Sequence, residues 1–204
     1  MEIMMRTSNL LAVAAVAALL STAAALPAAA ETLANAQLKD GSGKAIGDAD
    51  LVQTQGGVLI KLQLKGVAPG EHAFHIHAVG KCEAPFESAG PHFNPTNHKH
   101  GMMSGEGHAG DMPNLHVPQS GELSVEVINS SISLEKGKPN SVFDNDGSSL
   151  VIHAKADDYK SDPAGNSGDR IACGVIQQSG ATVGSSPPKN VPAIRERQNV
   201  PAEK

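Results

Sequence analysis

Seven side chains between residues 75 and 153 are of the types that bind transition metals. They comprise six imidazoles and one carboxylate, namely His75, His77, His92, His100, His108, Asp111 and His153. A closed tetrahedral zinc site takes four protein ligands, and a catalytic zinc site takes three and a water molecule. Seven candidates exceed the needs of one ion. The sequence therefore predicts two metal ions, in preference to one ion with several bystander histidines.

The spacing of His75 and His77 predicts that both reach the same ion. They alternate with Phe74 and Ile76, and successive side chains of a β-strand point to opposite faces. Cα atoms at positions i and i+2 of a strand lie about 6.5 Å apart. Both rings can then approach one ion at about 2 Å. The pair alone is a weak signal, and the later histidines strengthen it.

Residues 89–115 are rich in Gly, Pro and Asn, and they carry four of the candidates. This segment shows neither the alternation of a strand nor the apolar stripe of a helix, so it predicts a long loop. A long irregular loop in a compact domain needs a functional or structural reason. Coordination supplies one, because a His/His/His/Asp set suits a closed zinc site. His153 lies on a separate apolar run, 150–154, and the fold must bring it to the others.

Short alternating segments separated by turns must position these ligands. Residues 58–64 and 122–127 alternate, and residues 171–176 form another short strand. Asn145-Asp146-Gly147 predicts a hairpin-type turn that leads into the His153 strand. The pattern predicts an all-β sandwich or barrel.

The first thirty residues are typical of a secretory signal. Arg6 is followed by an apolar run, 10–26, and by a small-residue cleavage site at 28–30. An uncleaved membrane anchor is the alternative, which the small residues disfavour. No later segment is long and apolar enough to span a bilayer. We expect cleavage near Ala30 and no stable membrane insertion.

Composition limits what the remaining chain can be. Removal of residues 1–30 leaves 174 residues, enough for one domain, which we place at 31–177. The net charge is −5, with one Tyr and no Trp, which disfavours nucleic-acid binding. From about residue 178 the chain is rich in Pro, Gly, Ser and charge, so 178–204 is predicted to be a disordered tail.

Cys82 and Cys173 are the two cysteines of the chain. In an exported protein they are expected to form a disulfide. The closed loop of about 90 residues would contribute roughly 4–5 kcal/mol in the chain-entropy model. Thiolate coordination is the weaker alternative, because neither cysteine has a partner at CxxC spacing.

Six blocks of the sequence resemble, in order, the metal segments of copper/zinc superoxide dismutase. They are FHIH (74–77), SAGPHFNP (88–95), KHG (99–101), HAGD (108–111), LVIHAKADD (150–158) and GNSGDRIACGVI (165–176). The resemblance covers roughly residues 33–177. The short Lys81-Cys82 segment is similar to the exported bacterial branch.

The resemblance implies a fold and a role for each candidate residue. The implied fold is an eight-stranded Greek-key β-barrel or sandwich with long metal-binding and electrostatic loops. Copper/zinc superoxide dismutases share this architecture with immunoglobulin-like domains. The implied copper ligands are His75, His77, His92 and His153. The implied zinc ligands are His92, His100, His108 and Asp111, with His92 as the bridge. Asp157 would link His75 to His100, Arg170 would lie beside the open copper position, and Cys82 and Cys173 would form the disulfide.

The implied function is disproportionation of superoxide to O₂ and H₂O₂ by alternating Cu(II) and Cu(I). Each chain would hold one copper and one zinc, and four imidazole nitrogens suit Cu(II). Zinc has no redox chemistry and would hold His92 and the loop. Arg170 would attract the anion, and His92 would carry a proton. The implied setting is antioxidant defence in the periplasm, as a monomer or a homodimer.

Several other residues carry weaker alternatives. His72 is expected to be a satisfied, partly buried histidine, His98 a solvated loop residue and His116 an exposed strand residue. Met102 and Met103 are either soft copper contacts or packing residues. Asp158 is a rival to Asp157.

Other functions could use the same histidines. A copper carrier would not need a bridging histidine or Arg170. A copper-free relative would lack one of the copper ligands, and a zinc hydrolase would need an open zinc position.

Overall fold

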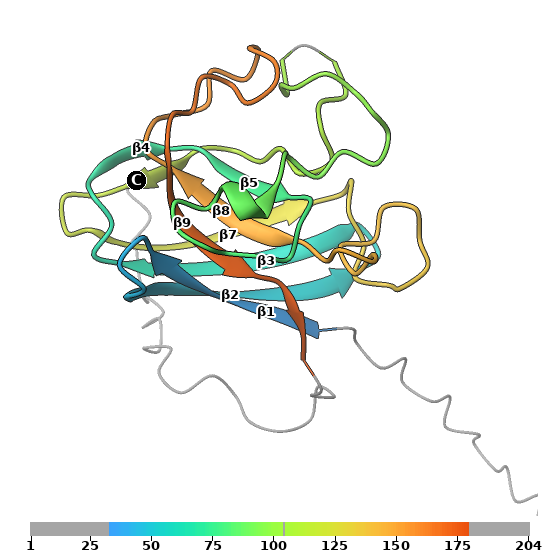
Figure 1. The fold of residues 1–204 in the computed structure, drawn as a ribbon, viewed down its shortest axis with the longest axis horizontal. Helices are drawn as coiled ribbons and strands as arrows, with labels where there is room; N and C mark the ends of the chain where they lie inside the picture. Colours follow the sequence, from blue (N-terminus) through green and yellow to red (C-terminus); the bar gives the residue numbers. More distant parts are fainter. Residues whose placement is uncertain (1–32, 104, 180–204) are drawn as a thin grey trace, which may run out of the picture.

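The computed structural model describes residues 33–103 and 105–179, which form a curled antiparallel β-sheet with long loops above it in Figure 1. The strands are β1 (Leu33–Asp40), β2 (Ala45–Thr54), β3 (Gly57–Lys65), β4 (Gly70–His72), β5 (Phe74–His77), β6 (Leu115–Val117), β7 (Glu122–Asn129), β8 (Ser149–His153), β9 (Arg170–Val175) and β10 (Gln177–Gln178). The predicted signal lies outside the described residues. The predicted tail does too, except that β10 includes its first residue, Gln178, and Ser179 follows.

The main sheet has the order β5-β8-β9-β1-β2-β3-β7, with β10 beside β1, and β4 and β6 form a second small sheet. The one helix among the described residues is a 3₁₀ turn, η1 (Glu87–Ala89). No helix in the described part of the chain has the length and apolar character needed to cross a bilayer. The predicted all-β architecture is confirmed.

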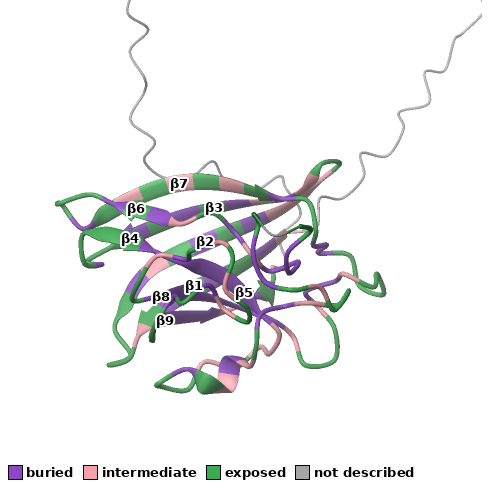
Figure 2. Ribbon diagram, turned by 90° about the horizontal axis from the view of Figure 1, so that it is seen from above, coloured by how far each residue is buried: buried purple, intermediate pink, exposed green. Residues whose placement is uncertain are grey.

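Alternation explains why the central strands form. In β3 the side chains of Val58, Ile60, Leu62 and Leu64 are buried, and the residues between them face outward. The same two-residue period is visible on β7 in Figure 2, where half-buried and exposed residues alternate. Such a period places every second side chain on the core face. The predicted strand at 122–127 is confirmed as β7.

The bend at residues 145–147 is present, but the hairpin predicted there is wrong. Gly147 has a φ of 67°, which suits a turn. However, β8 pairs with β5 and β9 and not with the strand that precedes the bend. The bend instead contacts the loop after β5, where Gly80 N donates to Asp146 O at 2.8 Å. A local turn signal fixes the direction of the chain but not the partner of the next strand.

The strands β5 and β8 have two buried faces with different contents. Phe74, Ile76, Leu150 and Ile152 belong to the main core inside the curled sheet. The residues between them point to the other face, which the loops cover. There Val151 packs with Phe86, Ala89 and Cys173 in a second, smaller cluster. The candidate histidines of these strands therefore lie outside the main core and beneath the loops.

Candidate metal centre

Strand register brings three of the candidate histidines together. His75 lies opposite Val151 and His77 opposite Ser149 in the β5–β8 pair. His153 ends β8, and its backbone N donates to Ala73 O at 2.9 Å. His75, His77 and His153 are all almost fully buried. The predicted position of His75 and His77 on one face agrees with the structure, and the β5–β8 pairing brings His153 to them.

The long loop brings two more candidates to the free edge of β5. Phe93 N donates to Ile76 O at 2.8 Å, and Ile76 N donates to Gly110 O at 2.9 Å. Because of these bonds His92 lies opposite His77, and Asp111 lies opposite His75. A Cβ atom at Gly110 would overlap Ile76 O, so the close approach requires glycine there.

Two groups of four ligands result, and they share His92. The first group is His75, His77, His92 and His153, and the second is His92, His100, His108 and Asp111. Within each group the candidate ligand atoms lie within 4.8 Å of one another. All seven sequence candidates are thus placed in one centre, with His92 between the two groups.

Hydrogen bonds leave one nitrogen of each ring in the first group free to bind a metal. His77 Nδ1 lies 2.8 Å from Gly90 O, and His153 Nδ1 lies 3.2 Å from Gly168 O. His75 Nε2 lies 2.8 Å from Asp157 Oδ2. Since these oxygens only accept, the nitrogen beside each carries the proton. The lone pairs remain on His77 Nε2, His153 Nε2 and His75 Nδ1, as in metal sites where outer partners fix the tautomer.

The second group gathers around one carboxylate oxygen. Asp111 Oδ1 lies 2.9 Å from His92 Nδ1, 3.1 Å from His100 Nδ1 and 3.4 Å from His108 Nδ1. The other oxygen, Oδ2, accepts from the backbone N of Gly101 and of His108 at 3.0 and 2.9 Å. Three imidazoles and one carboxylate are a common closed set for zinc.

Unpartnered buried nitrogens show that these groups fit metal ions. His75 Nδ1 and His92 Nε2 are buried and have no hydrogen-bond partner, and His100 Nδ1 is poorly aligned with Asp111 Oδ1, which lies 3.1 Å away. Buried polar atoms normally have one, and an ion is a recognised explanation when they do not. In addition, His77 Nε2 lies 3.3 Å from His153 Nε2, and His92 Nδ1 lies 3.3 Å from His108 Nδ1. Each pair joins two rings of one ligand group at a separation that allows both nitrogens to bind one ion.

Burial keeps three of the histidines neutral. Desolvation lowers the pKa of His77 to about 2, that of His92 to about 4 and that of His153 to about 3. Neighbouring histidines and, for His77 and His153, the charge of Arg170 lower the pKa further. The neutral form is the one that binds metal. These three rings are therefore ready to coordinate at neutral pH.

The carboxylates of the centre stay ionised. Burial opposes the charge of Asp111, but hydrogen bonds from His100, His108 and His92 outweigh it and hold its pKa well below the usual range. Asp157 behaves in the same way, with bonds from His100 and His75. Burial also disfavours the charged form of His100, yet its bonds to Asp111 and Asp157 raise its pKa to about 9.

Arg170 lies at the start of β9, opposite His153 in the β8–β9 pair. Its Nη1 donates to Phe86 O at 2.7 Å, and its Nη2 lies 3.8 Å from a Glu87 carboxylate oxygen. The side chain is 16% exposed, so a positive charge reaches the surface beside the first ligand group. The predicted Cys82–Cys173 disulfide is present and ties the Phe86 segment to β9.

The structure also places the remaining candidates. His72 is buried, with ring nitrogens 2.8 Å from His153 O and 2.9 Å from Ala68 O. His98 pairs with Glu106 at 3.4 Å, and His116 is 73% exposed, so both lie outside the two ligand groups. Met102 and Met103 are 49% and 70% exposed, so the packing role considered for them is wrong.

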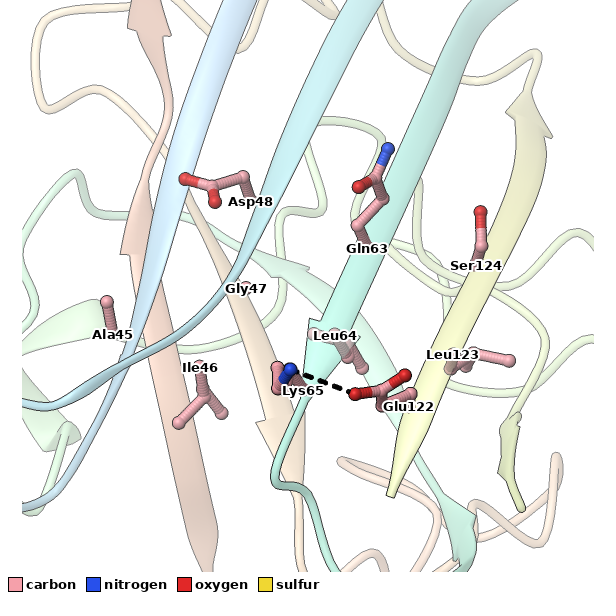
Figure 3. A pocket seen from close by; sticks show the side chains of 10 residues that line it. All are labelled: Ala45, Ile46, Gly47, Asp48, Gln63, Leu64, Lys65, Glu122, Leu123 and Ser124. Carbon is pink, nitrogen blue, oxygen red and sulfur yellow. Dashed lines mark ion pairs between the residues drawn. The ribbon is translucent and has the colours of Figure 1, made fainter. Parts of the chain in front are cut away.

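Two cavities differ in their relation to the histidines. A cavity of about 530 Å³ reaches His92 and His108 from the side of the second ligand group. Another, of about 710 Å³, lies over β2, β3 and the start of β7 (Figure 3). Its rim carries the Lys65–Glu122 ion pair at 3.0 Å, and none of its ten lining residues is a histidine or a cysteine. The second cavity is therefore separate from the metal centre.

Sequence reasoning missed several residues that hold the centre in place. They are the Phe86 carbonyl beside Arg170, Asn114 and Tyr159 around Asp157, Gly165 against Asp157, and Ser167 beside His153. A signal existed for Tyr159, because Asp157 can accept a hydrogen bond from the backbone two residues on. The other contacts join segments far apart in the sequence and carry no local signal.

The curled sheet and the two ligand groups that share one histidine define a β-barrel protein with a two-metal centre. The family model for copper/zinc superoxide dismutase (SODC) matches residues 45–176. A superoxide dismutase [Cu-Zn] of Aquifex aeolicus is 53% identical over 73% of this chain and 90% of its own length.

Solved structures agree with this match. A SOD-like protein from Bacillus subtilis is 41% identical, with a TM-score of 0.67 over 69% of this chain and 96% of that one. A Cu/Zn superoxide dismutase from Brucella abortus is 29% identical, with a TM-score of 0.59 over 71% and 99%. The chain belongs to the copper/zinc superoxide dismutase family. The predicted family is confirmed, and with it the enzyme class and the pair of metals that define the family.

Proposed function

We propose that this protein disproportionates superoxide to O₂ and H₂O₂ at the two ligand groups described above. The observation that supports this most is the position of His92, which belongs to both groups, with Nδ1 2.9 Å from Asp111 Oδ1 and Nε2 without a hydrogen-bond partner. His75, His77, His92 and His153 would hold copper, and His92, His100, His108 and Asp111 would hold zinc. Copper supplies one-electron redox chemistry and zinc supplies fixed positive charge.

Arg170 binds and orients the substrate anion. Its guanidinium is always protonated, and its partly exposed charge lies beside the copper ligands. The Phe86 carbonyl fixes one side of the guanidinium and leaves other N–H groups for the anion. A local positive field can attract superoxide although the chain has a net charge of −5, because focusing depends on the cleft.

His92 delivers one of the two protons that the reaction consumes. Two superoxide anions and two protons give one O₂ and one H₂O₂. His92 Nε2 is the unpartnered nitrogen that faces the first group, so a proton carried there lies next to the substrate position. The second proton comes from water.

A set of purified variants tests the copper assignment. The wild-type protein should contain one copper and one zinc per chain and disproportionate superoxide. His153→Ala should lose copper and activity while it keeps zinc, because His153 belongs to the first group alone. His116→Ala serves as the matched control, since His116 is exposed on β6. Full copper and activity in His153→Ala would refute the copper assignment.

A dismutase-like protein that binds zinc without copper is the second candidate. A Bacillus subtilis relative is named a SOD-like protein and not a dismutase, which is a reason to test copper content and activity separately. Metal analysis separates the two, because this candidate predicts zinc alone in a protein exposed to both metals. The complete first group of four buried histidines favours the dismutase.

We also propose that the protein is exported to the periplasm, with residues 1–30 removed, and that the tail predicted at 178–204 starts after Ser179, because Gln178 and Ser179 bond to β1. The disulfide supports export, since such bonds persist in oxidising compartments. Mass analysis of the periplasmic fraction should find a chain that begins at Glu31. The protein acts as a monomer or a homodimer, and sedimentation of the mature protein distinguishes the two.

A further inference from the structure

Asp157 occupies a position between the two ligand groups that demands accurate placement. Its Oδ2 lies 2.8 Å from His75 Nε2, and its Oδ1 lies 3.0 Å from His100 Nε2. One carboxylate thus contacts one ligand from each group through different oxygens. A small rotation of Asp157 would weaken both contacts.

The side chain of Asn114, from a distant part of the chain, makes two hydrogen bonds to the backbone of Asp157. Asp157 N donates to Asn114 Oδ1 at 2.8 Å, and Asn114 Nδ2 donates to Asp157 O at 2.9 Å. The two residues are 43 positions apart in the sequence. This pair of bonds fixes the position of the Asp157 backbone relative to the start of β6.

Tyr159 completes the network with three contacts. Its backbone N donates to Asp157 Oδ1 at 2.6 Å, and its hydroxyl accepts from Asn114 N at 2.7 Å. Its carbonyl accepts from Met103 N at 3.2 Å, in the loop between His100 and His108. Tyr159 has a φ of 60°, a left-handed conformation that costs free energy for a bulky residue and is retained here by these contacts.

We propose that Asn114 and Tyr159 are positioning residues that set the orientation of Asp157 and thereby link the copper and zinc ligand groups. The inference rests on the proposed function. Neither residue belongs to a ligand group, so both act through Asp157. Partners of this kind fix the tautomer and direction of metal-binding histidines, and their loss typically lowers metal affinity 10–100-fold.

Two variants of nearly unchanged shape test the network. Asn114→Asp keeps the acceptor for Asp157 N but removes the Nδ2 donor and places a carboxylate oxygen against Asp157 O. Tyr159→Phe removes the hydroxyl alone. The zinc dissociation constant should rise about 10–100-fold in Asn114→Asp and by a smaller factor in Tyr159→Phe. The copper EPR spectrum and the visible spectrum of cobalt placed in the zinc group should both shift, because Asp157 contacts both groups.

Asn94 provides a matched control. It makes the same pair of bonds to a backbone, with His98 N at 3.0 Å and His98 O at 2.8 Å, but it does not contact Asp157. Asn94→Asp should therefore keep wild-type zinc affinity and both spectra. Unchanged affinity and spectra in Asn114→Asp, or equal changes in Asn94→Asp, would overturn the inference.

Fluorescence separates a positioning effect from misfolding. Tyr159 is the one tyrosine of the chain, and there is no tryptophan. Tyrosine emission therefore reports on this network alone, and zinc binding to the wild-type protein should change it. If thermal melting shows that Asn114→Asp does not fold, the copper EPR and cobalt visible spectra of Tyr159→Phe test the positioning role instead. A wild-type protein that binds neither metal would instead refute the proposed function.

Discussion

At the scale of single residues, burial and hydrogen bonds set the charge of each ligand before a metal arrives. His77, His92 and His153 are neutral because water is excluded from them, and Asp111 and Asp157 are ionised because histidines donate to them. The ligand groups thus combine neutral imidazoles with fixed negative charge. A divalent cation gains both coordination and charge compensation there.

The metal-free protein should be most stable near pH 6.5. The pKa values of His77, His92 and His153 lie below the unfolded value of 6.5, so the unfolded chain binds more protons as the pH falls below 6.5. Below pH 6.5, each of these histidines lowers the free energy of unfolding by up to about 1.4 kcal/mol per pH unit. The pKa of His100 is raised to about 9, so its contribution is complete below pH 6.5 and is lost as the pH rises through 9.

Denaturant titrations after chelation, at pH values from 5 to 9, measure this profile. The decline should be steeper on the acid side, because three groups act there and one acts on the alkaline side. A free energy of unfolding that rises between pH 6.5 and 5 would contradict the assignment of neutral, buried histidines.

At the scale of elements, the loop 154–169 depends on a glycine that faces Asp157. Gly165 has a φ of +62°, and a Cβ atom there would overlap Asp157 Oδ1 and lie 2.8 Å from His100 Nε2. Gly165→Ala should displace Asp157 and lower the affinity for zinc about 10–100-fold. Metal titration with a competing chelator measures this loss.

Gly43→Ala is the control for Gly165→Ala. Gly43 has a φ of +85°, and a Cβ atom there would meet nothing within 4 Å. Both variants should lose about 1–2 kcal/mol of stability from the left-handed conformation, but only Gly165→Ala should lose metal. Equal zinc affinity in the two variants would show that Gly165 acts through backbone strain alone.

The sequence predicts those elements whose side chains carry a periodic or chemical signal. His75 and His77 alternate with Phe74 and Ile76, which specifies both the ligand face and the core face. By contrast, β1 and β2 were not predicted individually, because their core faces use small residues such as Ala34, Ala36 and Ala49. Small side chains weaken the apolar alternation that marks a strand.

Contacts between distant segments explain the remaining gaps. The position of His153 beside His75 depends on the β5–β8 pairing, which no local pattern specifies. Asn114 resembles any polar loop residue until the fold brings it to Asp157. The resemblance to a known family supplied the pairing of ligands that the residues alone left open.

At the scale of the whole molecule, the disulfide connects the sheet to the loop whose Phe86 carbonyl accepts a hydrogen bond from Arg170. Cys82 and Cys173 are 91 residues apart, and Phe86, which bonds Arg170, lies in the tied segment. Cys82→Ser should lower the free energy of unfolding by roughly 4–5 kcal/mol in the chain-entropy model. It should also weaken the dependence of the dismutation rate on ionic strength, because Arg170 loses its fixed partner.

Chemical denaturation and stopped-flow rates at several salt concentrations measure these two effects. Ser42→Ala, in the β1–β2 turn, is a suitable control because the Ser42 hydroxyl donates to Asp40 within the same turn. An unchanged salt dependence together with lower stability would mean that the disulfide stabilises the fold without orienting Arg170.

The alternation of ligands and core residues along β5 and β8 limits how this gene can change. Insertion or deletion of one residue in β5 would reverse the two faces of the strand. The imidazoles would then enter the hydrophobic core, and Phe74 and Ile76 would face the metal ions. Selection should therefore remove insertions and deletions within residues 74–77 and 149–153. Among the segments described, it is tolerated most easily in turns such as 41–44.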